Sequence, residues 1–375
     1  MKTQSGKNGN KMILDNLKNT TVLITGHTGF KGSWLAIFLN LLGADVIGYA
    51  LPPYTKKDNF VVTKLSKKIT DINSDIRNYE RLYQVFTNYK PEIVFHLAAQ
   101  SLVKRSYREP KYTYDVNIGG LVNLLECCRK TDSVKVIINV TSDKCYENNN
   151  WTWGYRENDP MGGYDPYSSS KGCSELISSS YKKSFFNPAA YSYHKKSISS
   201  VRAGNVIGGG DWSNYRLVPD CIKALENKKV IDIRNPIARR PWQFVLEPLG
   251  GYLLLASKML EEPKKYSGAW NFGPDYSSII TVKDVVKKII NNYGKGKWHS
   301  SNGESNKEHE ANFLALDTSK ARYHIGWQPI YNIDKAINKT VNWYKEMSKG
   351  NQNMMNVCQN QINEYIELIG KKWKS

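Results

Sequence analysis

The stretch Thr21–Gly32 (TVLITGHTGFKG) decides the fold, because a short β-branched run leads directly into three glycines spaced G-x-x-G-x-x-G. An apolar run, Trp34–Leu39, follows the last glycine and predicts a helix. Glycines allow a tight turn and a close approach to the backbone, and a helix N-terminus offers free N–H groups. This order is typical of a pyrophosphate site for a dinucleotide. The predicted cofactor-binding residues of the turn are Gly26, Thr28, Gly29, Phe30, Lys31 and Gly32.

Short apolar strands alternate with helical segments beyond this turn. The predicted strands cover 44–49, 93–97, 134–140 and 198–202, and the predicted helices cover 78–89, 113–130 and 167–183. Short strands that are apolar throughout are typical of a parallel sheet covered on both faces. The predicted fold class is therefore α/β: a Rossmann-type doubly wound parallel sheet with a smaller, mixed α/β substrate-binding lobe.

The domain organisation follows from where this alternation begins and ends. Residues 1–19 are polar and aperiodic, which predicts a flexible extension. Residues 20–200 form the predicted Rossmann domain, and residues 201–348, with shorter and mixed segments, form a substrate lobe interleaved with it. The polar stretch 349–361 begins a C-terminal tail, 349–375, that we expect to pack loosely.

Composition excludes several classes of protein. The chain has 375 residues, and it lacks both a run of 18 apolar residues and an apolar signal-peptide core, so we expect a cytoplasmic protein without a membrane partner. Its six cysteines include no CxxC pair, which argues against a disulfide framework and a metal site. The net charge of +19 comes from lysines scattered in pairs rather than from a dense basic arm. We expect a solvated basic surface that attracts a phosphorylated substrate, and no nucleic-acid partner.

The choice between NAD and NADP stays open at the end of the second strand. An acidic residue there would bind the adenosine 2′-hydroxyl, but the sequence reads Ala50–Pro53. Lys56 and Lys57 follow and would suit a 2′-phosphate, or else are ordinary surface charges. Asp75 and Ile76, after the third strand, are expected to bind the adenine.

A tyrosine and a lysine four residues apart, Tyr167 and Lys171, begin a predicted helix and lie on one of its faces. A nearby ammonium favours the phenolate, which can then accept a proton from a substrate hydroxyl. Ser142 follows the strand ending at Val140 and is the candidate to hydrogen-bond that hydroxyl. With the glycine turn, this set resembles the short-chain dehydrogenase/reductase superfamily. Asn117 matches a position of that superfamily that supports the helix carrying Tyr167 and Lys171.

Two further titratable groups, Asp143 and Lys144, follow Ser142 directly. An acid and a base beside a newly formed ketone can remove the neighbouring proton and protonate a departing hydroxyl. The chain resembles the nucleotide-sugar 4,6-dehydratases, and Lys144 stands where other branches have glutamate, as in the CDP-glucose branch. The matching stretches are GHTGFKGSW (26–34), HLAAQ (96–100), SDKCYE (142–147), DPYSSSK (165–171), RAGNVIGGGDW (202–212) and RPWQFVLEPL (240–249).

The resemblance implies an activity and several roles. The cofactor would be NAD, and CDP-glucose would become CDP-4-keto-6-deoxyglucose by C4 oxidation, loss of water across C5 and C6, and hydride return to C6. Asp143 would be the general acid and Lys144 the base, which must then be neutral; otherwise Lys144 only orients, with Tyr167 or water as base. Leu97, Ala98 and Ala99 join the cofactor-binding set. The product would supply deoxysugars of lipopolysaccharide O-antigen, and the enzyme would be a homodimer or homotetramer joined through two helices per subunit.

The predicted substrate-binding residues come mostly from the second lobe. Arg216 and Arg240 are expected to bind the diphosphate through their guanidinium groups, with Asn205 nearby. Trp242, or Trp212, would stack on the pyrimidine or sugar, or else pack within the lobe. Gln100 is expected to face the nicotinamide or sugar, whereas His96 is more often a structural histidine.

Three alternatives stay open. The first is a 4,6-dehydratase of another nucleotide sugar, such as dTDP-glucose or GDP-mannose. The second is a C4 epimerase or reductase of the same fold, against which Asp143 and Lys144 argue. The third is a non-catalytic protein that binds a dinucleotide or RNA, against which the set of Ser142, Tyr167 and Lys171 argues.

Overall fold

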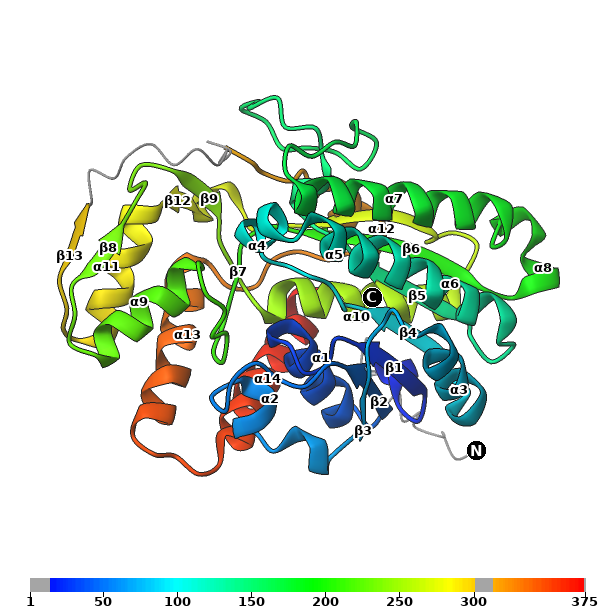
Figure 1. The fold of residues 1–375 in the computed structure, drawn as a ribbon, viewed down its shortest axis with the longest axis horizontal. Helices are drawn as coiled ribbons and strands as arrows, with labels where there is room; N and C mark the ends of the chain where they lie inside the picture. The colour runs from blue at the N-terminus through cyan, green and yellow to red at the C-terminus, as the bar shows by residue number, and fades with distance from the viewer. Residues whose placement is uncertain (1–13, 301–312, 374–375) are drawn as a thin grey trace, which may run out of the picture.

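Seven parallel strands form the central sheet (Figure 1). The structure, a computed structural model, describes residues 14–300 and 313–373. The strand order across the sheet is β11-β6-β5-β4-β1-β2-β3, which confirms the predicted Rossmann-type sheet. The strands are β1 (Thr21–Thr25), β2 (Asp45–Ala50), β3 (Thr70–Asn73), β4 (Ile93–His96), β5 (Val136–Val140), β6 (Ser197–Ala203) and β11 (Gly268–Phe272).

Helices cover both faces of the sheet because successive strand residues point to opposite sides. In β1, Val22 and Ile24 belong to one hydrophobic cluster and Leu23 belongs to the other. The first cluster includes residues of α1 (Phe30–Leu41), α10 (Leu246–Glu261), α13 (Ile333–Ser348) and α14 (Met354–Lys372). The second includes residues of α3 (Tyr79–Tyr89), α6 (Gly120–Lys130) and α7 (Pro166–Ser184).

A smaller lobe extends from one side of the sheet, on the left of Figure 1. In it β8 pairs in parallel with β13, and β9 pairs antiparallel with β12. Its elements are α9 (Leu217–Glu226), β8 (Ile231–Ile233), β9 (Arg239–Pro241), β12 (Ile279–Thr281), α11 (Val282–Tyr293) and β13 (Trp298–Ser300). Between β9 and β12 the chain returns to the large domain, where β11 pairs with β6. Residues 201–348 therefore contribute both to the lobe and to the central sheet.

Short elements connect these layers. They are α2 (Asn59–Val62), α4 (Val103–Arg108), α5 (Pro110–Tyr114), α8 (Tyr191–His194), β7 (Val206–Ile207), β10 (Gln243–Phe244) and α12 (Ser319–Ile325). A π-helical turn, Asp115–Gly119, joins α5 to α6, so the helix predicted over 113–130 is continuous in direction but irregular at its start. Such turns are frequent at functional sites.

The predicted loosely packed tail is wrong for residues 354–372, which form α14. Its N-terminus is capped by Asn353, whose side chain accepts a hydrogen bond from the Asn356 N–H. Cys358, Ile362 and Tyr365 are buried against the rest of the core. These apolar residues recur every three or four positions, and the polar residues between them concealed the pattern.

The predicted flexible extension, 1–19, is also wrong for its last part. Leu14 and Leu17 are buried in the first hydrophobic cluster, around a 3₁₀ turn at Asp15–Leu17. Residues 1–13 lie outside the described residues. The last part of the predicted extension is therefore packed against the core through Leu14 and Leu17.

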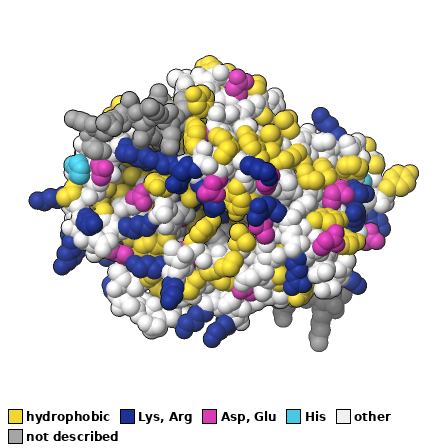
Figure 2. Space-filling model, in the orientation of Figure 1, with side chains coloured by type: hydrophobic (Ala, Val, Ile, Leu, Met, Phe, Trp, Pro, Cys, Tyr) yellow, Lys and Arg dark blue, Asp and Glu magenta, His cyan; other side chains and the backbone are white. Residues whose placement is uncertain are grey.

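Charge is spread over the surface as the sequence predicted. Figure 2 shows basic side chains dispersed over the visible face among fewer acidic ones, in keeping with 53 Lys and Arg against 34 Asp and Glu. Within 14–300 and 313–373, none of the helices combines the length and the apolar character that crossing a membrane requires.

Candidate active site

A cavity of about 660 Å³ opens beyond the carboxyl ends of the central strands, where open α/β sheets bind their ligands. It runs from the glycine turn after β1 to the first turns of α7. Every residue predicted to bind the cofactor lines it, namely Gly26, Thr28, Gly29, Phe30, Lys31, Gly32, Asp75, Ile76, Leu97, Ala98, Ala99, Tyr167 and Lys171.

The glycine turn leaves no room for side chains. Gly26 has φ +80°, and a Cβ there would lie 2.7 Å from the Ala98 nitrogen. A Cβ on Gly32 would lie 2.1 Å from the Gly26 carbonyl oxygen. The backbone of the turn therefore packs directly on β4 and on itself, and α1 begins at the edge of the cavity. This cradle fits the pyrophosphate of a dinucleotide, which binds backbone amides at a helix N-terminus.

Gly32→Ala is expected to destabilise the fold by about 1–3 kcal/mol, because the new methyl group would meet backbone that cannot rotate away. Urea unfolding measures this free energy. The matched control is Gly370→Ala in α14, where a Cβ has no described atom within 4 Å. That change should stabilise the helix by about 0.5–1 kcal/mol. Equal effects of the two variants would contradict the close packing of the turn.

At the end of the cavity predicted to hold the adenine, Asp75 and Lys57 already have partners within the protein. Both Asp75 carboxylate oxygens accept hydrogen bonds from the Arg77 guanidinium, which lowers the pKa of Asp75. Lys57 forms an ion pair with Glu226 and lies 4.7 Å from the centre of the Trp212 ring. Lys56 does not line the cavity. Lys57 does line the cavity, but its ammonium is paired with Glu226, so its geometry does not mark a dedicated 2′-phosphate site.

Helix α7, which carries Tyr167 and Lys171, is held by a cap and by buried hydrogen bonds. Asp165 caps α7, since its carboxylate accepts the Ser168 N–H at 3.0 Å. Lys171 Nζ donates to the Val140 carbonyl oxygen at 3.1 Å. Asn117 confirms its predicted role, because its Nδ2 donates to Ser170 Oγ at 2.8 Å. Tyr167 and Lys171 therefore face the end of β5 from a fixed helix.

The pKa values here are governed by burial. Burial raises the pKa of Tyr167 to about 12, although a hydrogen bond with Ser142 acts in the opposite direction. Burial lowers the pKa of Lys171 to about 8, opposed by the charge of Glu175. The lowered phenol pKa expected from the sequence is absent from the chain alone, because burial of Tyr167 outweighs its favourable neighbours. A positively charged ligand at this end of the cavity would favour the phenolate.

The acid and amine predicted after Ser142 lie in a 3₁₀ turn, Asp143–Cys145, directly beyond β5. Ser142 Oγ donates to Asp143 Oδ1 at 3.0 Å and accepts the Lys144 N–H at 3.2 Å. Asp143 is 5% exposed and lies against Gly204, where a Cβ would come within 2.9 Å of Asp143 Oδ2. Burial raises the pKa of Asp143, while the charge of Lys144 opposes the rise. A raised pKa favours the protonated carboxyl, which is the form that a general acid needs.

Basic groups converge on the same end of the cavity. Burial lowers the pKa of Lys31 to about 8, and the charges of Arg216 and Lys171 lower it further. Arg216 lines the cavity, with Nη1 2.9 Å from Asp211 Oδ2. Arg240 lies outside the lining, but its charge lowers the pKa of Asp143. The site can therefore attract an anionic group such as a diphosphate.

Other substrate-site predictions need correction. Gln100 lines the cavity, but its amide is engaged inside the protein with Leu102 and Thr113, so it does not present its polar atoms to a ligand. Trp242 is buried in the first hydrophobic cluster and does not line the cavity, whereas Trp212 does. Burial of a large aromatic ring explains this packing role.

Asn205 and His96 complete the predicted set. Asn205 lies outside the cavity lining, and its carbonyl oxygen accepts the Gln243 N–H at 3.0 Å. His96 is structural, as expected: its Nδ1 lies 2.7 Å from Thr25 Oγ1, and burial lowers its pKa to about 3. It is therefore neutral at physiological pH.

Sequence reasoning missed several residues of the cavity wall. Tyr54, Thr55 and Asp58 line it from the loop after β2, and Asp211 lines it beside Arg216. Asp211 stood within the matching stretch 202–212 but had no assigned role. The loop residues belong to no motif, so their place in the cavity wall could be seen only in the folded structure.

Comparisons with known proteins agree with this geometry. The family model described as GDP-mannose 4,6 dehydratase matches residues 23–340. The CDP-glucose 4,6-dehydratase of Salmonella typhimurium is 47% identical over 345 residues, which cover 92% of this chain and 96% of that protein.

Solved structures share the fold at lower identity. The UDP-glucose 4-epimerase of Thermotoga maritima, solved with UDP-glucose, superposes with a TM-score of 0.73 at 22% identity, covering 88% of this chain and 99% of that one. The dTDP-glucose 4,6-dehydratase of Bacillus anthracis, in complex with NAD, has a TM-score of 0.72 at 22% identity, covering 88% and 98%. With a model matched over most of its length and a relative at 47% identity, the chain belongs to the GDP-mannose 4,6 dehydratase family of extended short-chain dehydrogenases/reductases.

Proposed function

We propose that the protein is a CDP-glucose 4,6-dehydratase that uses NAD. The observation that carries this proposal is the acid–amine turn: Asp143 and Lys144 follow Ser142, and Ser142 is hydrogen-bonded to Tyr167 of the cavity lining. An epimerase or a reductase has no use for such a pair, whereas a dehydratase needs one. The substrate is taken from the Salmonella relative, whose 47% identity extends over nearly the whole chain.

The residues of the cavity divide between the cofactor and the sugar. The backbone of the glycine turn would hold the NAD pyrophosphate, while Ile76 and the loop after β2 would enclose the adenine and its ribose. Lys171 and Tyr167 would lie at the nicotinamide end. Bound NAD supplies the reaction with an acceptor that takes hydride from C4 and returns it to C6. Arg216 and Arg240 would bind the diphosphate of the nucleotide sugar.

Oxidation at C4 is the task of the first set of residues. Ser142 binds the C4 hydroxyl, and Tyr167 accepts its proton as the C4–H hydride leaves. The ammonium of Lys171 and the positive charge of the oxidised cofactor both favour the phenolate. The resulting ketone acidifies the hydrogen on C5.

Elimination is the task of the second set. Lys144 acts as the base and removes the C5 proton, and Asp143 protonates the C6 hydroxyl, which departs as water while a C5–C6 double bond forms. Hydride then returns to C6, and Lys144 returns a proton to C5. The sugar loses one molecule of water, and the cofactor ends in its original oxidation state.

The test offers CDP-glucose, dTDP-glucose, UDP-glucose and GDP-mannose separately with NAD, followed by mass spectrometry of the products. We expect loss of one water from CDP-glucose, without net NADH. With deuterium at C4, the label should appear at C6 of the product. Loss of water from one of the other sugars alone would reassign the substrate, and retention of mass with inversion at C4 would indicate an epimerase.

In the complex with NAD, whose positive charge favours the Tyr167 phenolate, the rate of C4 oxidation is expected to fall above pH 8, as Lys171 loses its proton. The sign follows from burial, which depresses the pKa of this lysine, so the ammonium that favours the phenolate is present below pH 8 and lost above it. Single-turnover formation of NADH measures the step. Since Lys31 also has a pKa of about 8, Lys31→Met is the control and should keep the decline. Loss of the decline in that variant would assign it to Lys31.

We also propose an oligomeric state and a cellular compartment for the enzyme, by analogy with its family. A homodimer or homotetramer joined through α6 and α7 would cover the outer face of α7, where Leu176 is 61% exposed and Phe185 46% exposed. Light scattering gives the mass in solution. All six cysteines are free thiols, as is usual in the cytoplasm, where CDP-glucose and NAD would be available. The deoxysugar product would enter lipopolysaccharide O-antigen synthesis.

A further inference from the structure

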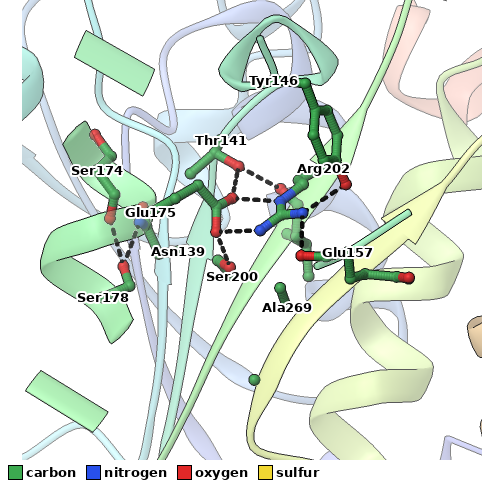
Figure 3. A network of polar contacts seen from close by, with 12 residues as sticks. Asn139, Thr141, Tyr146, Glu157, Ser174, Glu175, Ser178, Ser200, Arg202 and Ala269 are labelled. Atoms are coloured by element: carbon green, nitrogen blue, oxygen red, sulfur yellow. Dashed lines mark hydrogen bonds and ion pairs between the residues drawn. The ribbon is translucent and has the colours of Figure 1, made fainter. Parts of the chain in front are cut away.

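A buried ion pair lies directly behind the catalytic turn (Figure 3). Glu175 of α7 and Arg202 of β6 are 5% and 3% exposed. Two parallel hydrogen bonds join them: Arg202 Nε donates to Glu175 Oε1, and Arg202 Nη2 donates to Glu175 Oε2, both at 2.8 Å. Neither residue lines the cavity, and the Glu175 carboxylate and the Arg202 guanidinium are bonded to groups inside the protein.

The pair is bonded to the chain on both sides of the acid–amine turn. Thr141, which precedes Ser142, donates through Oγ1 to Glu175 Oε1 at 2.5 Å. Tyr146, two residues beyond Lys144, accepts at its hydroxyl from Arg202 Nη1 at 2.5 Å. Figure 3 shows both contacts converging on the same carboxylate–guanidinium unit. The turn between Thr141 and Tyr146 is therefore fixed at its two ends to one buried point.

The same pair is also fixed to the helix of the oxidation residues. Glu175 lies one helical turn after Lys171 and two turns after Tyr167 on α7. Tyr146 also bonds to the central sheet, since its hydroxyl donates to Asn271 Oδ1 of β11 at 2.8 Å. The ion pair thus links the two groups of residues that act in the two stages of the reaction.

A proton-relay role does not fit this pair. The Glu175 carboxylate accepts four hydrogen bonds, two from Arg202 and one each from Thr141 and Ser200. Burial alone would raise its pKa, but the hydrogen bonds and charge of Arg202 lower it overall. A role in stability alone is a weak explanation, because apolar residues of similar size often replace a buried ion pair without loss of stability.

We propose that Glu175 and Arg202 are positioning residues that hold the turn of Asp143 and Lys144 at working distance from Tyr167 and Lys171, so that elimination follows oxidation before the ketone is lost. The proposal rests on the proposed dehydratase function. Elimination depends on it more than oxidation does, since Tyr167 and Lys171 are also held by the Asn117 and Val140 contacts, whereas the turn relies on the ion pair at both ends.

The test cuts the two links and leaves the ion pair intact. Thr141→Val with Tyr146→Phe removes one hydroxyl on each side of the turn with little change of shape. Because misplacement of reacting groups by about 1 Å can cost 100-fold, we expect elimination to slow by about that factor. C4 oxidation, for which the turn supplies Ser142 alone, should slow by less than about tenfold. The spectroscopic signature is NADH that accumulates on the enzyme and a 4-keto product that retains its water. The matched control is Ser200→Ala, which removes a bond to the same carboxylate away from the turn and should keep NADH low.

A second variant guards against misfolding. Glu175→Met with Arg202→Met replaces the pair by apolar side chains, and it should unfold at a similar urea concentration while showing the same accumulation of NADH. Folded variants that dehydrate with the wild-type ratio of NADH to product would overturn the positioning role, and so would an equal slowing of both steps. If the wild-type enzyme itself fails to remove water from CDP-glucose, the proposed function is what fails.

Discussion

Tyr167→Phe should slow C4 oxidation by about 1,000-fold, because general-base catalysis by a positioned side chain contributes about 100- to 10,000-fold and no other phenol faces Ser142 in the described cavity lining. Phenylalanine fills the buried position, so the fold should persist. Both the transient NADH and the loss of water should disappear together, since elimination needs the ketone. Single-turnover absorbance with CDP-glucose and NAD measures the first, and product mass measures the second.

The control for this variant is Tyr181→Phe on the same helix. The Tyr181 hydroxyl donates to Glu126 at 2.9 Å, away from the cavity, so its loss should leave both steps near the wild-type rate. A Tyr167→Phe enzyme that forms NADH at more than a tenth of the wild-type rate would show that another group takes the proton.

Lys144→Ala should separate the two stages of the reaction, because it should block elimination but not C4 oxidation. Dehydration should fall by about 100- to 1,000-fold through loss of the base, while a slow C4 oxidation continues and NADH accumulates. The measurement is the ratio of NADH to dehydrated product in a single turnover. Normal dehydration by this variant would refute the base assignment.

Lys144→Arg separates the two roles considered for this residue. A guanidinium keeps the positive charge but does not give up its proton in proteins. If Lys144 is the base, the arginine variant should fail as the alanine variant does. If Lys144 only orients, the arginine variant should keep much of the activity, and Tyr167 or water would then be the base.

The nucleotide-binding half of the fold was predictable because its signals are local. A β-branched run, three glycines and an apolar helix stand side by side at Thr21–Leu39, and β2, β4 and β5 are short, largely apolar runs. The C-terminal helix escaped prediction because its buried residues, such as Cys358 and Tyr365, are separated by polar ones and only contact with the core shows their common face. The average polarity of a segment does not show whether its apolar residues share one face of a helix.

The site was predictable where a motif carries the chemistry and unpredictable where burial decides the role. Tyr167 and Lys171 line one end of the cavity and Ser142 is hydrogen-bonded to Tyr167, as their spacing and place after a strand suggested. Gln100 and Trp242 both lie in matching stretches. The side-chain amide of Gln100 is hydrogen-bonded to neighbouring backbone, and the ring of Trp242 is packed in the core. The Glu175–Arg202 pair has no sequence signature, since its members are far apart along the chain and meet only across β6 and α7.

Because α14 packs with α1, a segment that leaves the ribosome early is completed by one that follows much later. α1 begins in the glycine turn, and its buried Phe38 lies with its ring centre 6.5 Å from that of Tyr365. During synthesis the apolar face of α1 therefore stays uncovered until α14 emerges. A truncated gene product that ends before residue 354 would expose that face permanently and invite aggregation, even though every residue of the cavity would still be encoded.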